Sequence, residues 1–345
     1  MKAIEYHAPG DIRVSSVPIP QCGDDEIRAK VDACAICGTD LKTYVHGNTR
    51  IKPPKIMGHE FTAVVETVGK NVEGFEPGQR IVMATSISCG KCFYCSKGYS
   101  NLCLDLRPMG FTYNGGMAEY ITIPAQALNN GHVIRVPEGV KAEYAALAEP
   151  VSCAVNACGN SNVKQGETVL VTGAGPMGII NACVARHFGA EKIIVADTNP
   201  LRLDHAANFG FDLIVNPDTQ DLRRAVLDFT GQIGADVAII AAPAKEPQQQ
   251  ALDMVRKRGT ICLFASLPAD SSILALDSRK IHYNEITVVG SSDSTPAHVE
   301  TAVELISTAQ IPAEKIATHI LPLEEILKGF DLMKSGQALR VVLKP

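Results

Sequence analysis

Apolar and polar residues alternate over short runs in residues 1–150, and turn signals separate the runs. Such alternation is typical of half-buried β-strands, and Gly and Pro mark the turns between them. The clearest runs are IRAKVDACAI, FTAVVETVG, RIVMATS and AEYITIP, and the turn signals are PGD, PPK, EPGQ and NGG. Residues 1–150 are therefore expected to form a β-rich domain.

The pattern changes at Val151, where the segment VSCAVNACGN consists of small residues and has a helical composition. Beyond it, short apolar runs alternate with helical stretches. The predicted strands are ETVLVTG, KIIVAD, LIVN, ADVAII, TICLFAS and ITVVGS. The predicted helices are Met177–Phe188, Leu201–Phe209, Asp218–Phe229 and Pro247–Arg258. Apolar strands that alternate with helices predict an α/β domain with a doubly wound parallel sheet over residues 151–290.

The residues after Gly290 contain one more predicted helix, Pro296–Ala309, and then only the short segments THILPL, EEILKGFDLMKS and LRVVLKP. These segments are too few to form a domain of their own. We therefore expect residues 291–345 to pack back onto the N-terminal domain and to complete it.

The composition is that of an ordinary globular protein, and 345 residues exceed what one hydrophobic core usually serves, so two domains are expected. The net charge is 32 − 37 = −5 with no basic tract, which argues against nucleic-acid or membrane partners. The start, MKAIEYHAPGDIRV, lacks the pattern of a secretory signal, so a cytoplasmic location is expected. In a reducing compartment, eleven cysteines indicate metal binding or catalysis rather than disulfides.

A glycine motif follows the first predicted strand of the second domain. Gly173, Gly175 and Gly178 form the pattern G-x-G-x-x-G, with Pro176 and Met177 inside it, between a strand and a helix. In that context the first glycine permits a tight turn, the second lets a pyrophosphate approach the backbone, and the third allows close helix–strand packing. The motif predicts a dinucleotide site.

Asp197 ends the next predicted strand, 19 residues beyond Gly178. A carboxylate at this position accepts hydrogen bonds from the adenosine ribose and repels a 2′-phosphate, which favours NAD over NADP. Arg202 is an opposing signal, since an arginine nearby accommodates that phosphate. The alternative role for Asp197 is to cap the following helix.

Four cysteines, Cys89, Cys92, Cys95 and Cys103, lie in the segment CGKCFYCSKGYSNLC. Iron–sulfur ferredoxins continue this spacing differently and commonly carry a second set, which is absent here. Four thiolates from one loop suit tetrahedral zinc, and a complete Cys₄ shell leaves no position for a substrate. We therefore expect a structural zinc site; four unrelated free thiols are the alternative.

A catalytic zinc needs three protein ligands and an open position. The candidates are Cys37 in AICGTD, His59 and Glu60 in IMGHE, and Glu149 in LAEP. Alone, each also fits an ordinary role, as a buried thiol, a core histidine or a surface carboxylate. Their positions at the junctions of predicted elements favour function, because functional groups collect there.

Together these motifs resemble the zinc-dependent medium-chain dehydrogenase/reductase family, collinearly over the whole chain. Glu149 in EPVSCAVNA is similar to the polyol, or sorbitol-type, dehydrogenases of that family. The resemblance implies a GroES-like catalytic domain, a Rossmann coenzyme domain, two zinc ions per chain and NAD. It also implies that Cys37 and His59 hold the catalytic zinc. Glu60 is expected as the third ligand, with Glu149 near enough to exchange with it.

The expected reaction is oxidation of a secondary alcohol, in which zinc lowers the pKa of the hydroxyl and NAD accepts the hydride. Thr39, two residues from Cys37, is expected to accept the hydroxyl proton. Many relatives have a histidine soon after this motif, but this sequence has Lys42 at that position. His46 is therefore the candidate for the terminal proton acceptor. The alternative is that His46 is an ordinary exposed loop histidine. Further residues that the resemblance brings close to the coenzyme are Gly290, Ser291 and Arg340.

A small-molecule polyol or sugar alcohol is the expected substrate. Arg50, Lys52 and Lys55 raise a phosphorylated polyol as a variant, although a solvated loop also explains them. Threonine and simple alcohols stay open as substrates. A non-catalytic protein that binds zinc and a dinucleotide is the alternative from another class. A zinc-free reductase of the same superfamily is opposed by the presence of the zinc-ligand residues. Relatives commonly form homodimers or homotetramers, which is the expected assembly.

Overall fold

The computed structural model describes all 345 residues and divides into two compact units. The first unit comprises Met1–Ser152 and Asp293–Pro345, and the second comprises Cys153–Ser292. The sequence-based boundaries stand at 150 and 291. Each unit has its own hydrophobic core. None of the helices combines the length and apolar character needed to span a membrane.

The first unit is built on β-strands, as the alternation of its sequence indicates. A seven-stranded sheet has the order β10-β6-β5-β3-β18-β17, with β9 also paired to β3. Its strands are β3 (Ile27–Ala35), β5 (Glu60–Val68), β6 (Arg80–Met83), β9 (Tyr120–Ile123), β10 (Val133–Arg135), β17 (His319–Pro322) and β18 (Val341–Lys344). In β3 buried and less buried residues alternate along most of the strand, so one face packs on the core. Strand β3 is therefore amphipathic along most of its length.

A smaller sheet in this unit has the order β2-β1-β4, formed by β1 (Lys2–Ala8), β2 (Asp11–Ser16) and β4 (Lys55–Ile56). Strands β7 (Ser86–Ile87) and β8 (Arg107–Pro108) pair and bracket the four-cysteine segment. The helices of the unit are α1 (Gly38–His46), α2 (Phe93–Ser96), α3 (Ala125–Asn129), α4 (Ala142–Ala145), α11 (Pro296–Ser307), α12 (Ala313–Ile316) and α13 (Ile326–Ser335). Helix α5 (Ala148–Asn160) spans the chain boundary between the units.

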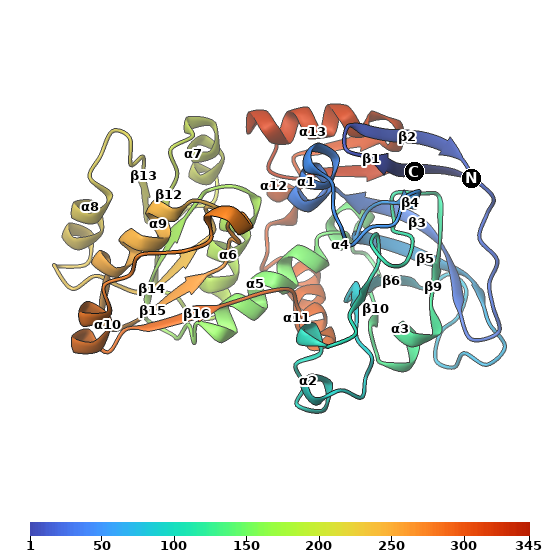
Figure 1. The fold of residues 1–345 in the computed structure, drawn as a ribbon, viewed down its shortest axis with the longest axis horizontal. Coiled ribbons are helices and arrows are strands. Elements are labelled where there is room, and N and C mark those ends of the chain that lie inside the picture. The colour runs from blue at the N-terminus through green and yellow to red at the C-terminus, as the bar shows by residue number, and fades with distance from the viewer. The chain divides into compact units, whose positions relative to one another are not determined.

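The C-terminal segment enters the N-terminal sheet. Strand β18 pairs antiparallel with β3, so that Val342 lies opposite Ala35, and β17 pairs parallel with β18. In Figure 1 the last part of the chain, in red, accordingly lies among the blue N-terminal strands. The sheet that begins with β3 is thus completed by the end of the chain.

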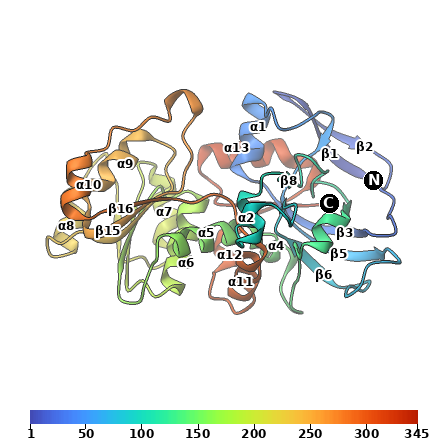
Figure 2. The ribbon, with the colours of Figure 1, turned by 60° about the horizontal axis from the view of Figure 1, so that its bottom comes forward.

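The second unit is a doubly wound α/β domain with six parallel strands in the order β13-β12-β11-β14-β15-β16. This is the Rossmann order 3-2-1-4-5-6. The strands are β11 (Thr168–Thr172), β12 (Lys192–Ala196), β13 (Leu213–Val215), β14 (Ala235–Ile240), β15 (Val255–Leu263) and β16 (Thr287–Gly290). The helices are α6 (Pro176–His187), α7 (Pro200–Ala207), α8 (Leu222–Phe229), α9 (Lys245–Gln250) and α10 (Ser278–Asn284). Helix α6 packs on β11 and β12. Helix α10 packs on β15 (Figure 2).

One predicted helix is wrong in its second half. The prediction was Pro247–Arg258, but α9 ends at Gln250, a short 3-10 turn follows, and Val255 begins β15. Val255 pairs with Ala235 of β14, and the guanidinium of Arg256 reaches the carboxylate of Asp236 at 2.5 Å. Pairing with a central strand, together with this ion pair, outweighs the helical propensity of the VRKR segment.

Candidate active site and zinc-binding residues

Strand pairing brings together metal-ligand candidates that are distant in sequence. Ala35 at the end of β3 lies opposite Glu60 at the start of β5. Cys37 follows β3 after one residue, and His59 directly precedes β5. The two ligand segments therefore meet at the same end of the sheet.

The backbone around His59 and Cys37 is held in place by close local contacts. Gly58 has a φ of 94°, and a Cβ there would lie 2.6 Å from Met117 and 2.7 Å from the sulfur of Cys34, so only glycine fits. The Cys37 N–H donates to Asp40 Oδ2 at 2.9 Å, which closes the first turn of α1. Asp40 Oδ1 lies 3.7 Å from His59 Nδ1. Asp40 thus contacts both candidate segments, as a brace would.

The three residues fit a zinc ion by their chemistry and by their unsatisfied atoms. One ligand atom each from Cys37, His59 and Glu60 lies within 4.8 Å of the others. His59 Nδ1 and both carboxylate oxygens of Glu60 are buried without a hydrogen-bond partner. Buried polar atoms rarely stay unsatisfied. A thiolate, an imidazole and a carboxylate also make up a ligand set that zinc takes in catalytic sites.

The electrostatics of this group depend on its burial. Burial alone would lower the pKa of His59, but the negative charges of Cys37 and Asp40 raise it well above its usual range. These charges favour the protonated imidazole in the absence of a bound metal. Metal binding requires a neutral imidazole, so it displaces this proton.

Arg340 forms a buried ion pair with Glu60. Its side chain is 2% exposed, its Nη1 donates to Ile36 O at 2.9 Å, and its Nη2 is 3.1 Å from Glu60 Oε1. Pairing of β18 with β3 places it there. The sequence-based expectation assigned Arg340 to the coenzyme; the contact seen within the first unit is with Glu60, as an ion pair that orients the carboxylate.

Glu149 lies in the first turn of α5 and belongs to a second acidic group, in which a carboxylate oxygen lies within 4.8 Å of one from Asp293. Burial raises the pKa of Glu149 to about 8, and the charge of Glu60 adds to the effect. Burial also raises the pKa of Asp293. The charges of Glu60 and His59 act on the pKa of Glu149, whose carboxylate is grouped with Asp293 and not with Cys37, His59 and Glu60.

Thr39 and His46 lie in the first and last turns of the same helix, α1. Seven residues at 1.5 Å per residue separate them by roughly 10 Å along the helix axis. His46 is exposed, whereas Thr39 is half-buried. The two side chains are therefore not in direct contact, and a proton needs an intermediate carrier to pass between them.

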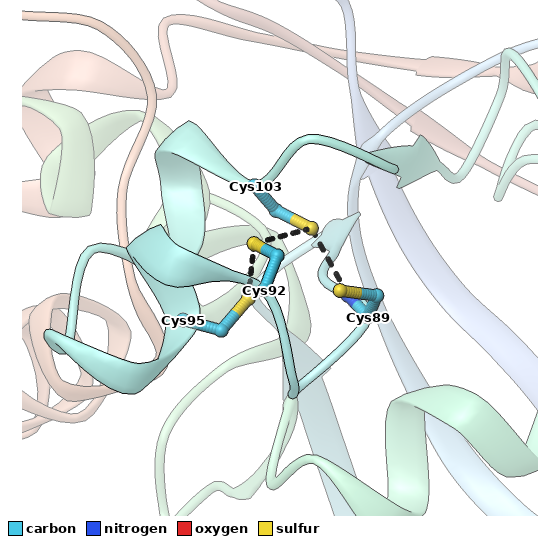
Figure 3. A group of neighbouring side chains, drawn as sticks. All are labelled: Cys89, Cys92, Cys95 and Cys103. Carbon is cyan, nitrogen blue, oxygen red and sulfur yellow. Dashed lines mark hydrogen bonds between the residues drawn. The ribbon is translucent and has the colours of Figure 1, made fainter.

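The four cysteines of the CGKCFYCSKGYSNLC segment converge in one lobe (Figure 3). Their sulfur atoms lie within 4.8 Å of one another, and no disulfide forms among them. The backbone N–H groups of Leu104 and Cys95 lower the pKa of Cys92 to about 6, while burial raises that of Cys103 to about 12. Four sulfur ligands at this spacing fit a structural zinc with a closed shell.

Ser88, the residue before this segment, is anchored by the stretch from Gln126 to His132. Its carbonyl accepts from Gln126 at 2.9 Å and from Asn130 at 2.7 Å. Its N–H donates to His132 Nε2 at 3.1 Å, while His132 Nδ1 lies 2.9 Å from Ala84 O. Burial lowers the pKa of His132, so the ring stays neutral and can accept. These hydrogen bonds attach the four-cysteine lobe to the rest of the first unit.

The glycine motif has the geometry of a pyrophosphate-binding turn. Gly173 has a φ of 95°, and a Cβ at Gly178 would lie 1.6 Å from Gly173 O, so both positions require glycine. A Cβ at Gly175 would meet only the distal guanidinium of Arg202, at 3.9 Å, which leaves the surface over this residue open. Pro176 and Met177 form the first turn of α6, whose N-terminus has no side-chain cap. This helix end can therefore receive a phosphate.

Asp197 follows β12 and holds the glycine turn. Its Oδ2 accepts from Ala174 N at 2.7 Å, and its Oδ1 accepts from Asn199 N at 2.8 Å. The guanidinium of Arg202 lies 3.6 Å from its Oδ2. Asp197, which favours NAD, and Arg202, which favours NADP, are thus neighbours.

Gly290 and Ser291 lie where β16 ends, at the carboxyl edge of the parallel sheet. The hydroxyl of Ser291 is buried without a hydrogen-bond partner. Coenzymes bind outside the carboxyl edge of such sheets. The coenzyme role of Gly290 and Ser291 stays a prediction, and their position at this edge is compatible with it.

Two features of the site were not predicted. Asp293 lies half-buried beside Glu149 with a left-handed φ of 59°, and the Arg340–Glu60 ion pair joins residues that are distant in sequence. Neither leaves a local sequence signal, because both arise from tertiary packing.

Comparison with known proteins agrees with this arrangement. Residues 23–138 match the alcohol dehydrogenase GroES-like domain, and residues 176–308 match the zinc-binding dehydrogenase family. A sorbitol dehydrogenase of Halalkalibacterium halodurans is 33% identical over 100% of this chain and 99% of its own length. An L-threonine 3-dehydrogenase of Stenotrophomonas maltophilia is 34% identical over 99% of each chain.

A solved structure is similar throughout. A putative zinc-binding dehydrogenase from Sinorhizobium meliloti 1021, bound to NADP, superposes with a TM-score of 0.92 at 30% identity, covering 100% of this chain and 99% of its own. Fold and site thus define a zinc-binding dehydrogenase that uses a nicotinamide cofactor. The chain belongs to the zinc-dependent medium-chain dehydrogenase/reductase family and is an oxidoreductase. This assignment sets aside the non-catalytic alternative.

Proposed function

We propose that this protein oxidises a secondary hydroxyl group of a polyol or sugar alcohol, free or phosphorylated, to a ketone with NAD as the hydride acceptor. The observation that carries the proposal is the Cys37–His59–Glu60 group, in which His59 Nδ1 and both carboxylate oxygens of Glu60 are buried without a hydrogen-bond partner. Glu149 beside it supports the polyol branch, because the EP motif of the sequence is similar to that of sorbitol-type enzymes.

In this proposal the chain holds two zinc ions, one at Cys37, His59 and Glu60 and one at the four-cysteine lobe. When bound at the first site, zinc supplies the Lewis acidity that lowers the pKa of the substrate hydroxyl. Arg340 orients Glu60, and Asp40 orients Cys37 and His59. Glu149 is close enough to exchange with Glu60 as a ligand.

The chain's own groups also move the proton. Thr39, two residues from Cys37, is proposed to accept the proton of the substrate hydroxyl through its side-chain oxygen. His46 at the exposed end of α1 is proposed as the terminal group. Because the two are separated along the helix, transfer between them requires a carrier. Gly290, Ser291 and Arg340 are proposed to approach the coenzyme.

NAD is proposed over NADP because the Asp197 carboxylate stands at the end of β12, where a 2′-phosphate would meet its charge. Replacing Asp197 with Ser, with Arg202 kept, is expected to shift the ratio of kcat/KM for NADP against NAD by about 10- to 100-fold toward NADP, because like-charge juxtaposition costs a few kcal/mol. Steady-state kinetics with both coenzymes measure this ratio.

Two further variants control for damage to the glycine turn. Asp197→Asn retains an oxygen acceptor for Ala174 N while removing the charge, so it should shift the ratio in the same direction. Arg202→Ala should shift it toward NAD. An unchanged ratio in both Asp197 variants would refute the ribose role of this residue.

L-Threonine is the second candidate substrate, and simple alcohols are a third. The 34% identity to an L-threonine 3-dehydrogenase equals, within one percentage point, the identity to the sorbitol dehydrogenase. Overall sequence identity therefore does not distinguish a polyol from L-threonine as the substrate. The residues around the Cys37–His59–Glu60 group must determine which substrate is bound.

The proposal is tested by NADH formation with polyols, polyol phosphates, L-threonine and simple alcohols, after metal analysis of the protein. We expect about two zinc per chain and turnover of a secondary polyol hydroxyl. A fully metallated protein that turns over none of these compounds would overturn the proposed function. Exclusive turnover of L-threonine would replace the polyol by the second candidate.

A further inference from the structure

A cation lies one aromatic ring away from the proposed zinc ligand His59. The guanidinium carbon of Arg50 is 4.6 Å from the ring centroid of Phe111. The ring of Phe111 in turn lies 5.6 Å from the His59 ring at an interplanar angle of 57°. Phe111 is buried, whereas Arg50 is exposed. The charge of Arg50 is thus positioned at the edge of the metal group and stays accessible to solvent.

The guanidinium N–H groups of Arg50 donate no hydrogen bond within the protein, and only its backbone N–H does so, to Asn48 Oδ1. The first unit contains seven arginines, and six of them have a side chain that donates a hydrogen bond: Arg13, Arg28, Arg80, Arg107, Arg135 and Arg340. The guanidinium of Arg50 has neither a hydrogen bond nor an ion pair and is held by the face of Phe111 alone. Contact through the face of the guanidinium leaves its planar fork of N–H groups available for a carboxylate or phosphate.

The neighbouring basic residues do not duplicate this arrangement. Lys55 donates from Nζ to Thr112 O at 2.9 Å, and burial lowers its pKa. Lys52 is exposed, and no aromatic ring holds it. Of the basic cluster in the sequence, only Arg50 is therefore both oriented and unpaired next to the site.

The charge of Arg50 reaches the acidic side of the site. Burial raises the pKa of Asp293, and the charge of Arg50 lowers it. A carboxylate oxygen of Asp293 lies within 4.8 Å of one from Glu149. A neutral substrate gains little from such a cation. An anionic substrate gains more, because the guanidinium attracts the anion and offsets the charge of any ionised carboxyl group nearby.

We propose that Arg50 binds an anionic group of the substrate, a carboxylate or a phosphate, while the hydroxyl group to be oxidised lies at the Cys37–His59–Glu60 group. The substrate class is then a secondary alcohol that carries an anion, such as a sugar acid or a polyol phosphate, in preference to a neutral polyol. This inference rests on the proposed function and narrows its substrate.

The test compares sorbitol, gluconate and sorbitol 6-phosphate, which share a six-carbon chain, together with L-threonine, all with NAD. The wild-type protein should have a higher kcat/KM for at least one anionic compound than for sorbitol. In Arg50→Gln, the KM for that anionic compound divided by the KM for sorbitol should rise by about 10- to 100-fold. The corresponding ratio of kcat values should change little, because the lost contact is made equally in the ground state and the transition state.

Matched variants separate binding from structure. Arg50→Lys keeps the charge and should restore part of the ratio, although not the forked geometry. Lys52→Gln removes a charge two residues away and should leave the ratio unchanged. Raised ionic strength should increase the KM of the anionic compound in the wild type more than in Arg50→Gln, since salt screens the lost attraction.

Each outcome has a separate meaning. An effect confined to gluconate and L-threonine assigns a carboxylate, and one confined to sorbitol 6-phosphate assigns a phosphate. Turnover of sorbitol with equal changes of KM for neutral and anionic compounds in Arg50→Gln would overturn this inference and leave the proposed function standing. No turnover of any compound by the metallated protein would overturn the proposed function and this inference with it.

Discussion

Replacement of Cys37 by Ser is expected to lower the turnover of the preferred alcohol by at least about 10³-fold, because the metal contributes several kcal/mol and each 1.4 kcal/mol is a factor of ten. Serine is nearly isosteric but is not a thiolate, so the ligand group of Cys37, His59 and Glu60 loses its softest member. Zinc content should fall from about two to about one per chain. Steady-state NADH formation and elemental analysis measure both effects.

The matched control for this variant is Cys22→Ser. Cys22 lies in the same unit, where its thiol approaches the carbonyl oxygens of Glu26 and Thr67 at 3.3 and 3.6 Å, away from either cysteine group. It should keep full zinc content and turnover. Undiminished turnover in Cys37→Ser would contradict the assignment of the catalytic site.

Replacement of Cys95 by Ser should damage folding or assembly before chemistry. The four-cysteine lobe offers a closed set of ligands, so its zinc contributes to folding free energy rather than to the reaction. If about 5 kcal/mol is lost, the midpoint of thermal unfolding falls by about 10 °C or more, at 2–4 °C per kcal/mol. Differential scanning calorimetry with zinc analysis measures this change.

Ser96→Ala is the control within the same loop, because it removes only a hydrogen bond from the serine hydroxyl to Phe93 O. It should leave zinc content intact and thermal unfolding nearly so. A stable, correctly assembled Cys95→Ser protein that has lost turnover alone would show that the lobe takes part in chemistry.

The Rossmann unit was the most predictable part of the fold. Its central strands are buried on both faces and appear in the sequence as uninterrupted apolar runs. Gly173 begins the turn that leads from the first of them to the following helix. The one wrong helix, Pro247–Arg258, failed because a local pattern cannot report that Val255 pairs with Ala235.

The metal group was predictable only in part. Cys37, His59 and Glu60 stand beside recognisable junctions, and the pairing of Ala35 with Glu60 explains why the two segments meet. The sequence does not reveal that Arg340 supports Glu60, since this contact depends on β18 entering the sheet beside β3.

The substrate side was least predictable. In the sequence, Arg50 is one member of a basic loop, and no sequence pattern links it to Phe111. Only the stacking of the two beside His59 distinguishes Arg50 from its neighbours. Contacts between side chains of different loops depend on the tertiary structure. They leave no periodic pattern in the sequence from which they could be predicted.

Staged zinc removal tests the central claim most directly. A chelator is added to the wild-type protein while released zinc, NADH-forming activity and thermal unfolding are followed on the same samples. The site with a carboxylate ligand should release its zinc before the four-thiolate site, because zinc is held more weakly by harder ligands. We expect activity to disappear with the first equivalent of zinc and the unfolding temperature to fall only with the second. Activity that survives loss of the first equivalent, or a fully active protein that holds only the zinc of the four-cysteine lobe, would contradict the account.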